Sequence, residues 1–172
     1  MPHDCEQPQP NKYYLYIIFS GLPLDQRLID PINRRLLDEL QKDGRITLAE
    51  LARRLHVSPP TVAERLSKLE SASVIRGYHA DVDPAAAGYG LSAIVRVRPA
   101  PRQLHKVAEL VPGLPEVVEC HRITGEDCFM LKAHVRDVTH LEELIDQIAI
   151  FGDTTTSIIQ SSPVPPRGVS VV

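Results

Sequence analysis

The pattern of apolar and polar positions divides the chain into a helical front half and a mixed back half. In residues 30–41 apolar side chains recur every three or four positions, which is the spacing of one helix face. These positions are Ile32, Leu36, Leu37 and Leu40. Asp30 can cap such a helix, and Pro31 suits its first position. The pattern therefore predicts a first helix over 30–41, which Gly44 ends.

Two shorter helices are predicted directly after the first. Thr47 and Glu50 have the spacing of a capping box, and the run that they open has apolar residues on one face. These are Leu48, Leu51, Ala52 and Leu55. Ser58 can then cap a third helix, in which Pro59 and Pro60 lie where amide hydrogens have no helical partner. The inward positions of that helix are Val62, Leu66 and Leu69.

A short helix, a tight turn and a second helix with polar residues at its leading end form the helix-turn-helix plan. In this plan the second helix enters the major groove, where polar side chains meet base edges or phosphates. The candidate DNA-contacting residues are Ser58, Pro60, Thr61, Glu64, Arg65 and Lys68. From the pattern alone, a small helical bundle with a solvated basic face fits about equally well.

The back half alternates predicted strands and helices. Residues 78–90 are rich in turn formers and indicate a strand and a linker. The predicted strands that follow are 91–98, 117–123, 128–135 and 155–161. The residues that mark the two helices between them are Leu104, Val107, Ala108 and Val111, then Leu141, Leu144, Ile145 and Ile148. This order is the ferredoxin-like β-α-β-β-α-β plan, with both helices expected on one sheet face. The open face is expected to hold Cys128, Met130, Lys132 and His134.

The predicted fold class is α+β, with two domains. A helix-turn-helix, winged-helix-like domain spans 26–77, and a ferredoxin-like domain spans 91–163, after a linker at 78–90. An extension at 1–25 holds four of the eight aromatic residues, so we expect it to pack as an arm or strand on its own or a neighbouring subunit. The tail at 164–172 is expected to be extended and mobile.

Charge supports this division. The formal net charge is −3, but residues 26–78 carry ten Lys and Arg against seven Asp and Glu, whereas residues 79–172 carry eight against twelve. A local basic excess is a feature of nucleic-acid contact. No apolar run approaches the ~20 residues that span a bilayer, and no signal peptide is evident. We therefore expect a cytoplasmic protein without membrane contact, whose three scattered cysteines are reduced.

Enzymatic chemistry is not expected. Cys120, His121, Cys128 and His134 invite a thiol–imidazole or metal site, but strand alternation places Cys120 and His121 on opposite faces. The chain has no Gly-rich phosphate loop and no His-Glu-x-x-His pattern. We predict no catalytic residue, no metal and no cofactor.

The ordered set of segments resembles the Lrp/AsnC family of amino-acid-responsive transcription regulators over residues 28–163. The front part of the resemblance is "INRRLLDELQKDGRITLAELARRLHVSPPTVAERLSKLESASVIRGY", and the back part includes "TGEDCFMLKAHV" and "GDTTTSII". The resemblance implies that residues 91–163 are an effector and oligomerisation domain. It further implies a homodimer formed through the sheets, which assembles further into an octamer. It also implies that paired front domains read a pseudo-palindrome in double-stranded DNA.

The resemblance also implies an amino-acid effector bound between dimers, near the glycine turn and the last strand. The implied effector-binding residues are Thr124, Gly125, Asp127, Thr154 and Thr156. Two positions depart from the family pattern. Cys128 stands where many members have a carboxylate before an aromatic residue, and Ser73 stands where glycine often provides a left-handed helix stop.

Three functions follow as hypotheses. The first is a sequence-specific, effector-responsive transcription regulator. The second is an architectural protein that compacts DNA with little dependence on a ligand, and the third is a small-molecule-binding oligomer without DNA binding. Sequence-selective, ligand-sensitive DNA binding distinguishes the first from the other two.

Overall fold

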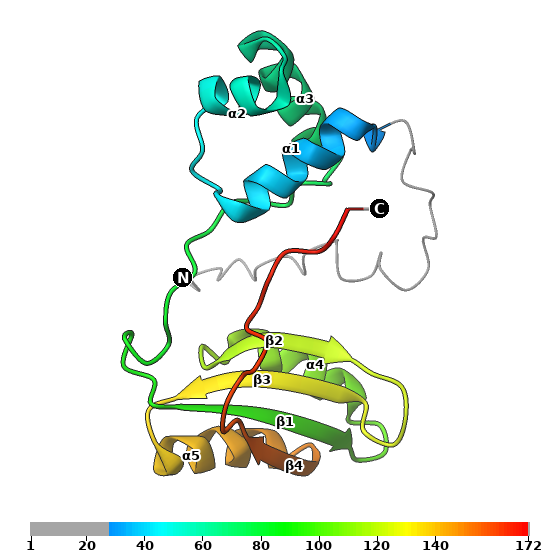
Figure 1. The fold of residues 1–172 in the computed structure, drawn as a ribbon. Coiled ribbons are helices and arrows are strands. Elements are labelled where there is room, and N and C mark those ends of the chain that lie inside the picture. The colour runs from blue at the N-terminus through cyan, green and yellow to red at the C-terminus, as the bar shows by residue number, and fades with distance from the viewer. Residues whose placement is uncertain (1–27, 172) are drawn as a thin grey trace, which may run out of the picture. The chain divides into compact units, whose positions relative to one another are not determined.

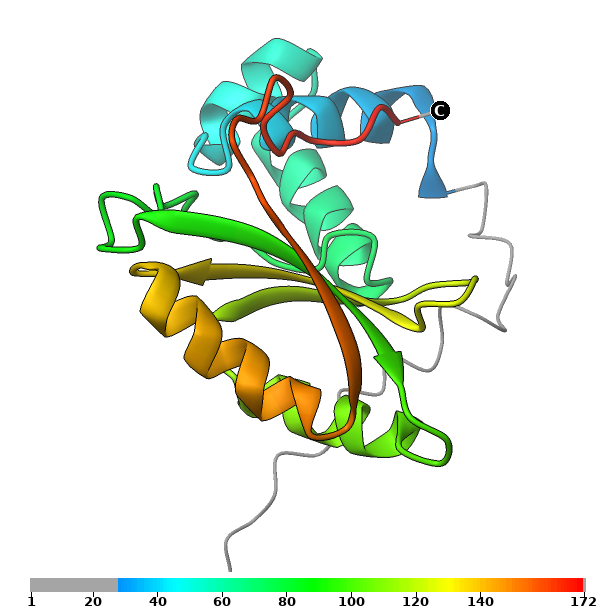
Figure 2. The ribbon, with the colours of Figure 1, turned by 90° about the horizontal axis from the view of Figure 1, so that it is seen from below.

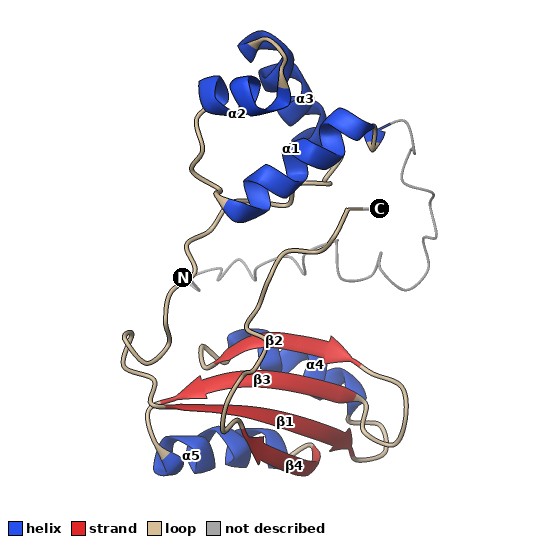
Figure 3. Ribbon diagram, in the orientation of Figure 1, coloured by secondary structure: helices blue, strands red, loops and turns tan. Residues whose placement is uncertain are grey.

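The computed structural model describes residues 28–171, which fold into two units (Figure 1). The first unit comprises the described residues up to His79 together with the segment that begins at Arg167, and the second comprises Ala80–Pro166. Helices alone make up the regular structure of the first unit, and a sheet with helices makes up the second (Figure 3). The α+β class is therefore confirmed. The arm predicted at 1–25 lies outside the described residues.

The first unit, here called the DNA-binding unit after its predicted function, contains the three predicted helices. They are α1 (Pro31–Lys42), α2 (Leu48–Leu55) and α3 (Pro59–Ser71). Asp30 Oδ1 accepts a hydrogen bond from the Asn33 amide at 2.7 Å, and Ser58 Oγ accepts one from the Thr61 amide at 3.3 Å. These caps satisfy first-turn amides that have no helical partner, so the polar residue before each proline sets where the helix begins.

The capping box predicted at α2 forms only in part. Thr47 Oγ1 accepts the Glu50 amide at 3.2 Å, but the Glu50 carboxylate bonds Arg53 and Arg54 on the next turn instead. Hydrogen bonds from these two guanidinium groups lower the pKa of Glu50 to about 2. The side chain therefore joins a surface ion-pair network instead of returning to the helix start.

A single apolar cluster holds the three helices together. Each helix contributes residues at the predicted spacing, so one face of every helix points inward. The buried members are Leu36, Leu37, Leu51, Ala52, Leu55, Val62 and Leu69. Burial of these side chains provides the main stabilisation of the unit, at about 25 cal/mol for each Å² of apolar surface removed from water.

Two helices in this unit end on left-handed residues that are not glycine. Ser73 has φ +57°, and its amide bonds the Glu70 carbonyl while the Val74 amide bonds the Leu69 carbonyl, both at 2.9 Å. This pair of bonds is the Schellman motif, here with an apolar contact between Val74 and the core. His56 also has φ +57°. The left-handed stop expected at residue 73 is thus made by a serine.

Ser73→Gly is expected to stabilise the DNA-binding unit by about 1 kcal/mol, because glycine adopts a positive φ without the steric cost that a Cβ imposes. Thermal unfolding followed by circular dichroism measures the change. Ala72→Gly is the matched control, since Ala72 has φ −83° and glycine there only adds freedom to the unfolded chain. A Ser73→Gly protein no more stable than the Ala72→Gly protein would contradict the strain at Ser73.

The second unit, here called the ligand-domain unit after the role that the resemblance implies, is a four-stranded antiparallel sheet with two helices. Its elements are β1 (Leu91–Pro99), α4 (Leu104–Leu110), the 3-10 turn η2 (Val111–Gly113), β2 (Val117–Arg122), β3 (Phe129–Val135), α5 (Val138–Ala149) and β4 (Gly152–Ile158). The strand order is β2-β3-β1-β4, which is the predicted ferredoxin-like arrangement. Both helices cover the same face of the sheet, as the two views in Figures 1 and 2 agree.

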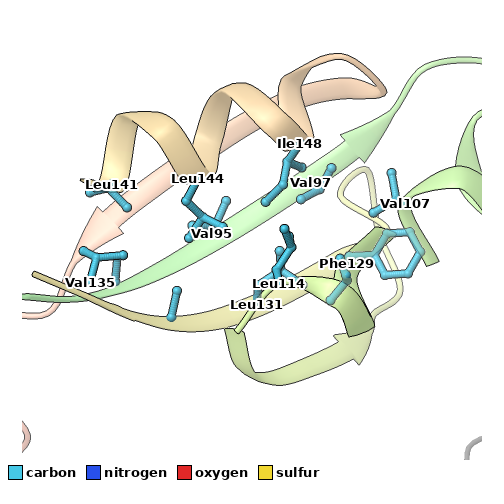
Figure 4. Close-up of a cluster of buried hydrophobic side chains, with 13 residues drawn as sticks. Val95, Val97, Val107, Leu114, Phe129, Leu131, Val135, Leu141, Leu144 and Ile148 are labelled. Carbon is cyan, nitrogen blue, oxygen red and sulfur yellow. The ribbon is translucent and has the colours of Figure 1, made fainter. Parts of the chain in front are cut away.

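The core of this unit lies between the sheet and the helices. Alternate residues of β1 and β3 point toward Leu141, Leu144 and Ile148 of α5 (Figure 4). The strand residues are Ala93, Val95, Val97, Phe129, Leu131, Ala133 and Val135. Because strand side chains alternate between faces, the intervening residues lie on the open face.

Three details differ from the sequence prediction. The last strand is Gly152–Ile158 instead of 155–161, because Gly152 pairs with Pro99 at a point where a Cβ would meet the Arg98 carbonyl. No strand occurs between residues 72 and 90, so neither the strand expected in 78–90 nor a wing is present there. Asp83 instead accepts the Ala85 amide at 3.0 Å, a local bond that competes with strand pairing.

Two side chains were also placed wrongly by alternation or periodicity. Ala108 is exposed. The apolar face of α4 continues instead through Val111 of η2 and through Leu114, which follows η2. Cys128, expected on the open face, packs against the core cluster. It lies just before β3, where the strand alternation does not yet apply.

Candidate DNA-binding surface and effector site

The leading end of α3 is exposed and polar. Ser58, Pro59 and Pro60 are all exposed, and Thr61 is half-buried, with its Oγ1 2.8 Å from Ser58 Oγ. The Ser58 cap and the two prolines define the start of the helix sharply. The structure therefore presents Ser58, Pro60 and Thr61 together at one tip, as the sequence predicts.

Glu64 and Lys68 lie one turn apart on the exposed side of α3. Lys68 Nζ is 2.6 Å from Glu64 Oε1, and the side chains are 62% and 66% exposed respectively. The hydrogen bond from Lys68 lowers the pKa of Glu64. An exposed ion pair of this kind contributes little to stability, so Lys68 can leave Glu64 for a phosphate at small cost.

Arg65 is different, because its side chain lies against α1. Its Nη1 is 2.6 Å from Asp30 Oδ2 and 2.9 Å from Asn33 Oδ1, and the side chain is 24% exposed. Asn33 is buried, and its Nδ2 donates to the Leu28 carbonyl at 2.7 Å. Asp30, Asn33 and Arg65, here called the α1–α3 polar network, join the start of α1 to α3, the predicted recognition helix. Sequence reasoning missed Asp30 and Asn33 as supports of α3, because they are distant from it along the chain.

The remaining cations of the DNA-binding unit are partly neutralised. Arg53 and Arg54 bind Glu50, and Lys42 and Arg54 bind Glu39. Among the described residues no carboxylate lies within ion-pair distance of Arg34, Arg45 or Arg76. Carboxylates therefore neutralise some cations of the DNA-binding unit and not others. On the exposed side of α3 the cation is Lys68.

In the ligand-domain unit, the turn between β2 and β3 carries the predicted effector residues Thr124, Gly125 and Asp127. Gly125 has φ +114°, a conformation that favours glycine. The Asp127 carboxylate lies 3.7 Å from Arg96 Nη1 and 3.8 Å from Arg98 Nε. Because Arg96 pairs across the ladder with Met130, the turn carboxylate lies beside two arginines of the open sheet face.

The other two predicted effector residues face the opposite way. Thr156 pairs with Val95 and Thr154 with Val97, and directly paired residues share a face in an antiparallel sheet. Since Val95 and Val97 are buried under the helices, Thr154 and Thr156 lie on the helix side of β4. Thr155, which pairs with Arg96, is the β4 hydroxyl on the face of Asp127. One protomer thus does not bring all five predicted residues together.

Cys120, His121, Cys128 and His134, the four residues considered for a thiol or metal site, do not converge. Cys120 pairs with Leu131 and packs on the core side, whereas His121 pairs with Met130 on the open face. Burial raises the pKa of the Cys120 thiol, which disfavours a thiolate nucleophile. His134 Nδ1 lies 2.7 Å from Ser92 Oγ, also on the open face. Within residues 28–171 no group of three or more His, Cys, Asp or Glu side chains is placed to hold a metal ion.

None of the helices that the structure describes is both long enough and apolar enough to span a bilayer.

Known proteins match this chain over both units. Residues 29–70 match the AsnC-type helix-turn-helix domain, and residues 92–169 match the Lrp/AsnC ligand binding domain. The HTH-type transcriptional regulator LrpC of Bacillus subtilis (strain 168) is 32% identical over 133 residues, which cover 77% of this chain and 92% of LrpC.

Two further proteins are similar to this chain over most of its length. The leucine-responsive regulatory protein of Escherichia coli (strain K12) is 33% identical over 138 residues, which cover 76% of this chain and 84% of that protein. The solved structure of the feast or famine regulatory protein from M. tuberculosis, complexed with L-methionine, matches with a TM-score of 0.78 at 35% identity. That match covers 82% of this chain and 98% of the other.

Proposed function

This chain belongs to the Lrp/AsnC family of transcription regulators, and we propose from that premise how it reads DNA and senses its effector. It combines an AsnC-type DNA-binding domain with an Lrp/AsnC ligand-binding domain. In our proposal α3 enters the major groove, where Thr61 and Glu64 contact base edges and give sequence specificity, and Lys68 binds a phosphate. Ser58 and Pro60 shape the tip that approaches the DNA.

The observation that carries this proposal is that α3 has an exposed polar side and a buried apolar side. Its tip and exposed side present Ser58, Thr61, Glu64 and Lys68, while Val62 and Leu69 anchor the opposite side in the core. Arg65 supports the helix from its flank through the α1–α3 polar network. A rigid helix with a free polar side is what major-groove readout requires.

We further propose that the effector is an amino acid bound beside Asp127. The M. tuberculosis relative is complexed with L-methionine, and the E. coli relative is named leucine-responsive. In this chain the Asp127 carboxylate can accept an α-ammonium group, and Arg96 and Arg98 can bind the α-carboxylate. Because Thr154 and Thr156 face away from Asp127, we propose that they contact the effector bound by a neighbouring copy, in a homodimer that assembles to an octamer.

Binding to the DNA upstream of the protein's own gene tests this function. Fluorescence anisotropy over a range of salt concentrations, with a scrambled duplex as control and pooled amino acids in a second series, separates the hypotheses. Tight, salt-sensitive binding that prefers the native duplex and shifts with amino acids is the expected result. Equal binding to both duplexes would favour an architectural, DNA-compacting role, and absence of binding at low salt would overturn the DNA-binding assignment.

Asp127→Ala is expected to raise the amino-acid concentration needed for half-maximal response at least tenfold and to leave DNA affinity without effector unchanged. The reason is that the variant removes the carboxylate proposed for the ammonium group, worth about 1.4 kcal/mol or more when the bond is charge-assisted. The same anisotropy titration measures both quantities. Glu126→Ala is the matched control, because Glu126 also binds Arg98 but is 84% exposed. Joint loss of DNA binding and response in Asp127→Ala would mean that the turn is structural.

A further inference from the structure

The segment Arg167–Val171, which the sequence predicts to be mobile, packs on the DNA-binding unit. The segment has no helix or strand, yet Val171 packs against the apolar cluster of the three helices. Residues from Arg167 onward accordingly belong to that unit, although they follow the sheet of the other unit along the chain. The segment runs beside α1 (Figure 2).

Three contacts of different kinds fix this segment on α1. Gln41 Nε2 donates a hydrogen bond to the Val169 carbonyl at 3.0 Å. Gly168 lies so close to the Gln41 side chain that an added Cβ would be 2.9 Å from Gln41 Cβ. Val171 is half-buried against the core, whereas the Val169 side chain is 77% exposed. The contacts therefore select one side of the segment, as a specific packing does.

We propose that residues 167–171 are a strap that completes the core of the DNA-binding unit and gives it a second covalent connection to the ligand-domain unit. The first connection is the chain between His79 and Leu91, and the second is residues 159–166. The second connection, residues 159–166, spans at most about 28 Å when fully extended. The strap therefore limits the orientations that the DNA-binding unit can sample. Because the DNA-binding unit then has fewer orientations before it binds, it loses less conformational entropy when it occupies a DNA site.

Val171→Asp tests the packing of the strap. This variant places a charge against the apolar cluster, and we expect it to lower the melting temperature of the DNA-binding unit by roughly 5 °C and to speed hydrogen exchange in α1. Val169→Asp is the matched control, since it adds the same charge to the same segment at an exposed position. Equal behaviour of the two variants would overturn the strap, whatever the protein does with DNA.

A disulfide trap then shows which chain provides the strap. Gln41→Cys combined with Gly168→Cys, in a background with Cys5, Cys120 and Cys128 replaced by serine, needs only a small shift to reach the Cβ separation of a disulfide. Mild oxidation is expected to give a cross-linked monomer on a non-reducing gel. A covalent dimer would mean that the strap comes from a second copy, and absence of any cross-link would mean that it does not dock. Each single-cysteine variant controls for random dimers.

Discussion

Lys68→Ala is expected to weaken DNA binding about fivefold for each recognition helix engaged, on every DNA sequence alike. Lys68 is 62% exposed on the free side of α3, and its only described partner is the equally exposed Glu64. A phosphate can replace Glu64 as the partner of Lys68 at little cost. When Lys68 neutralises a phosphate, the DNA releases bound cations, and this release makes the affinity depend on salt. The slope of log affinity against log salt should therefore fall by about 0.9 for each contact removed. In a dimer with both helices bound, the two losses combine to roughly 25-fold.

Anisotropy titrations at four or five salt concentrations measure both quantities on a specific and a scrambled duplex. Lys106→Ala is the matched control, because Lys106 forms the same kind of exposed pair with Glu109 on α4 but lies in the ligand-domain unit. An unchanged salt slope in Lys68→Ala would exclude the phosphate contact. A loss confined to the specific duplex would instead assign Lys68 to a base edge.

The sequence predicts the helices of the DNA-binding unit well because their start signals are local. Asp30, Thr47 and Ser58 each accept an amide three residues ahead, and both the cap and the amide lie within one turn of sequence. The strands of the ligand-domain unit were also found, because alternation in β1 and β3 is strong on a face that is buried. Such signals need no knowledge of which segments meet in space.

The errors arise where a residue is placed by a distant partner. The run of three threonines in β4 has no apolar alternation, so only its pairing with Val95 and Val97 decides that Thr154 and Thr156 face the helices. The start of β4 likewise depends on the close approach of Gly152 to the Arg98 carbonyl. Helical spacing alone predicts that Arg65 faces solvent. Its partner Asp30 is 35 residues away, so no local pattern could reveal that it supports α3 instead of lying free.

Arg65→Ala is expected to lower the free energy of unfolding of the DNA-binding unit by about 2 kcal/mol. The variant removes the donor to Asn33 Oδ1 and the cation beside Asp30, and Asn33 is only 5% exposed, so its amide oxygen is left without a partner in a site poor in water. The apolar stem of Arg65 is lost as well. Because the start of α1 and the recognition helix are joined by this network, DNA affinity should fall too, but with the salt slope unchanged.

Urea unfolding and the anisotropy titration distinguish this result from that of Lys68→Ala. Arg34→Ala is the control, since Arg34 is an exposed arginine of α1, and its change should stay within about 0.5 kcal/mol. Arg65→Lys keeps the charge and a nitrogen that can donate to both oxygens, but its side chain is shorter than that of arginine, so partial recovery is expected. A lower salt slope in Arg65→Ala, with stability unchanged, would place Arg65 on a phosphate and contradict the network.

The same network makes stability depend on acid pH. Partial burial raises the pKa of Asp30, but hydrogen bonds from the Asn33 amide and Arg65 outweigh it and lower the folded-state pKa below 3.8. A carboxyl whose pKa is lowered by folding contributes stability that is present above the unfolded value and is lost as the pH falls through the folded one. The stability difference between the natural protein and Arg65→Ala should therefore be constant from about pH 5 to 7 and shrink below about pH 4. A difference that persists unchanged to pH 2.5 would mean that packing of the Arg65 stem, and not the charge of Asp30, couples the two helices.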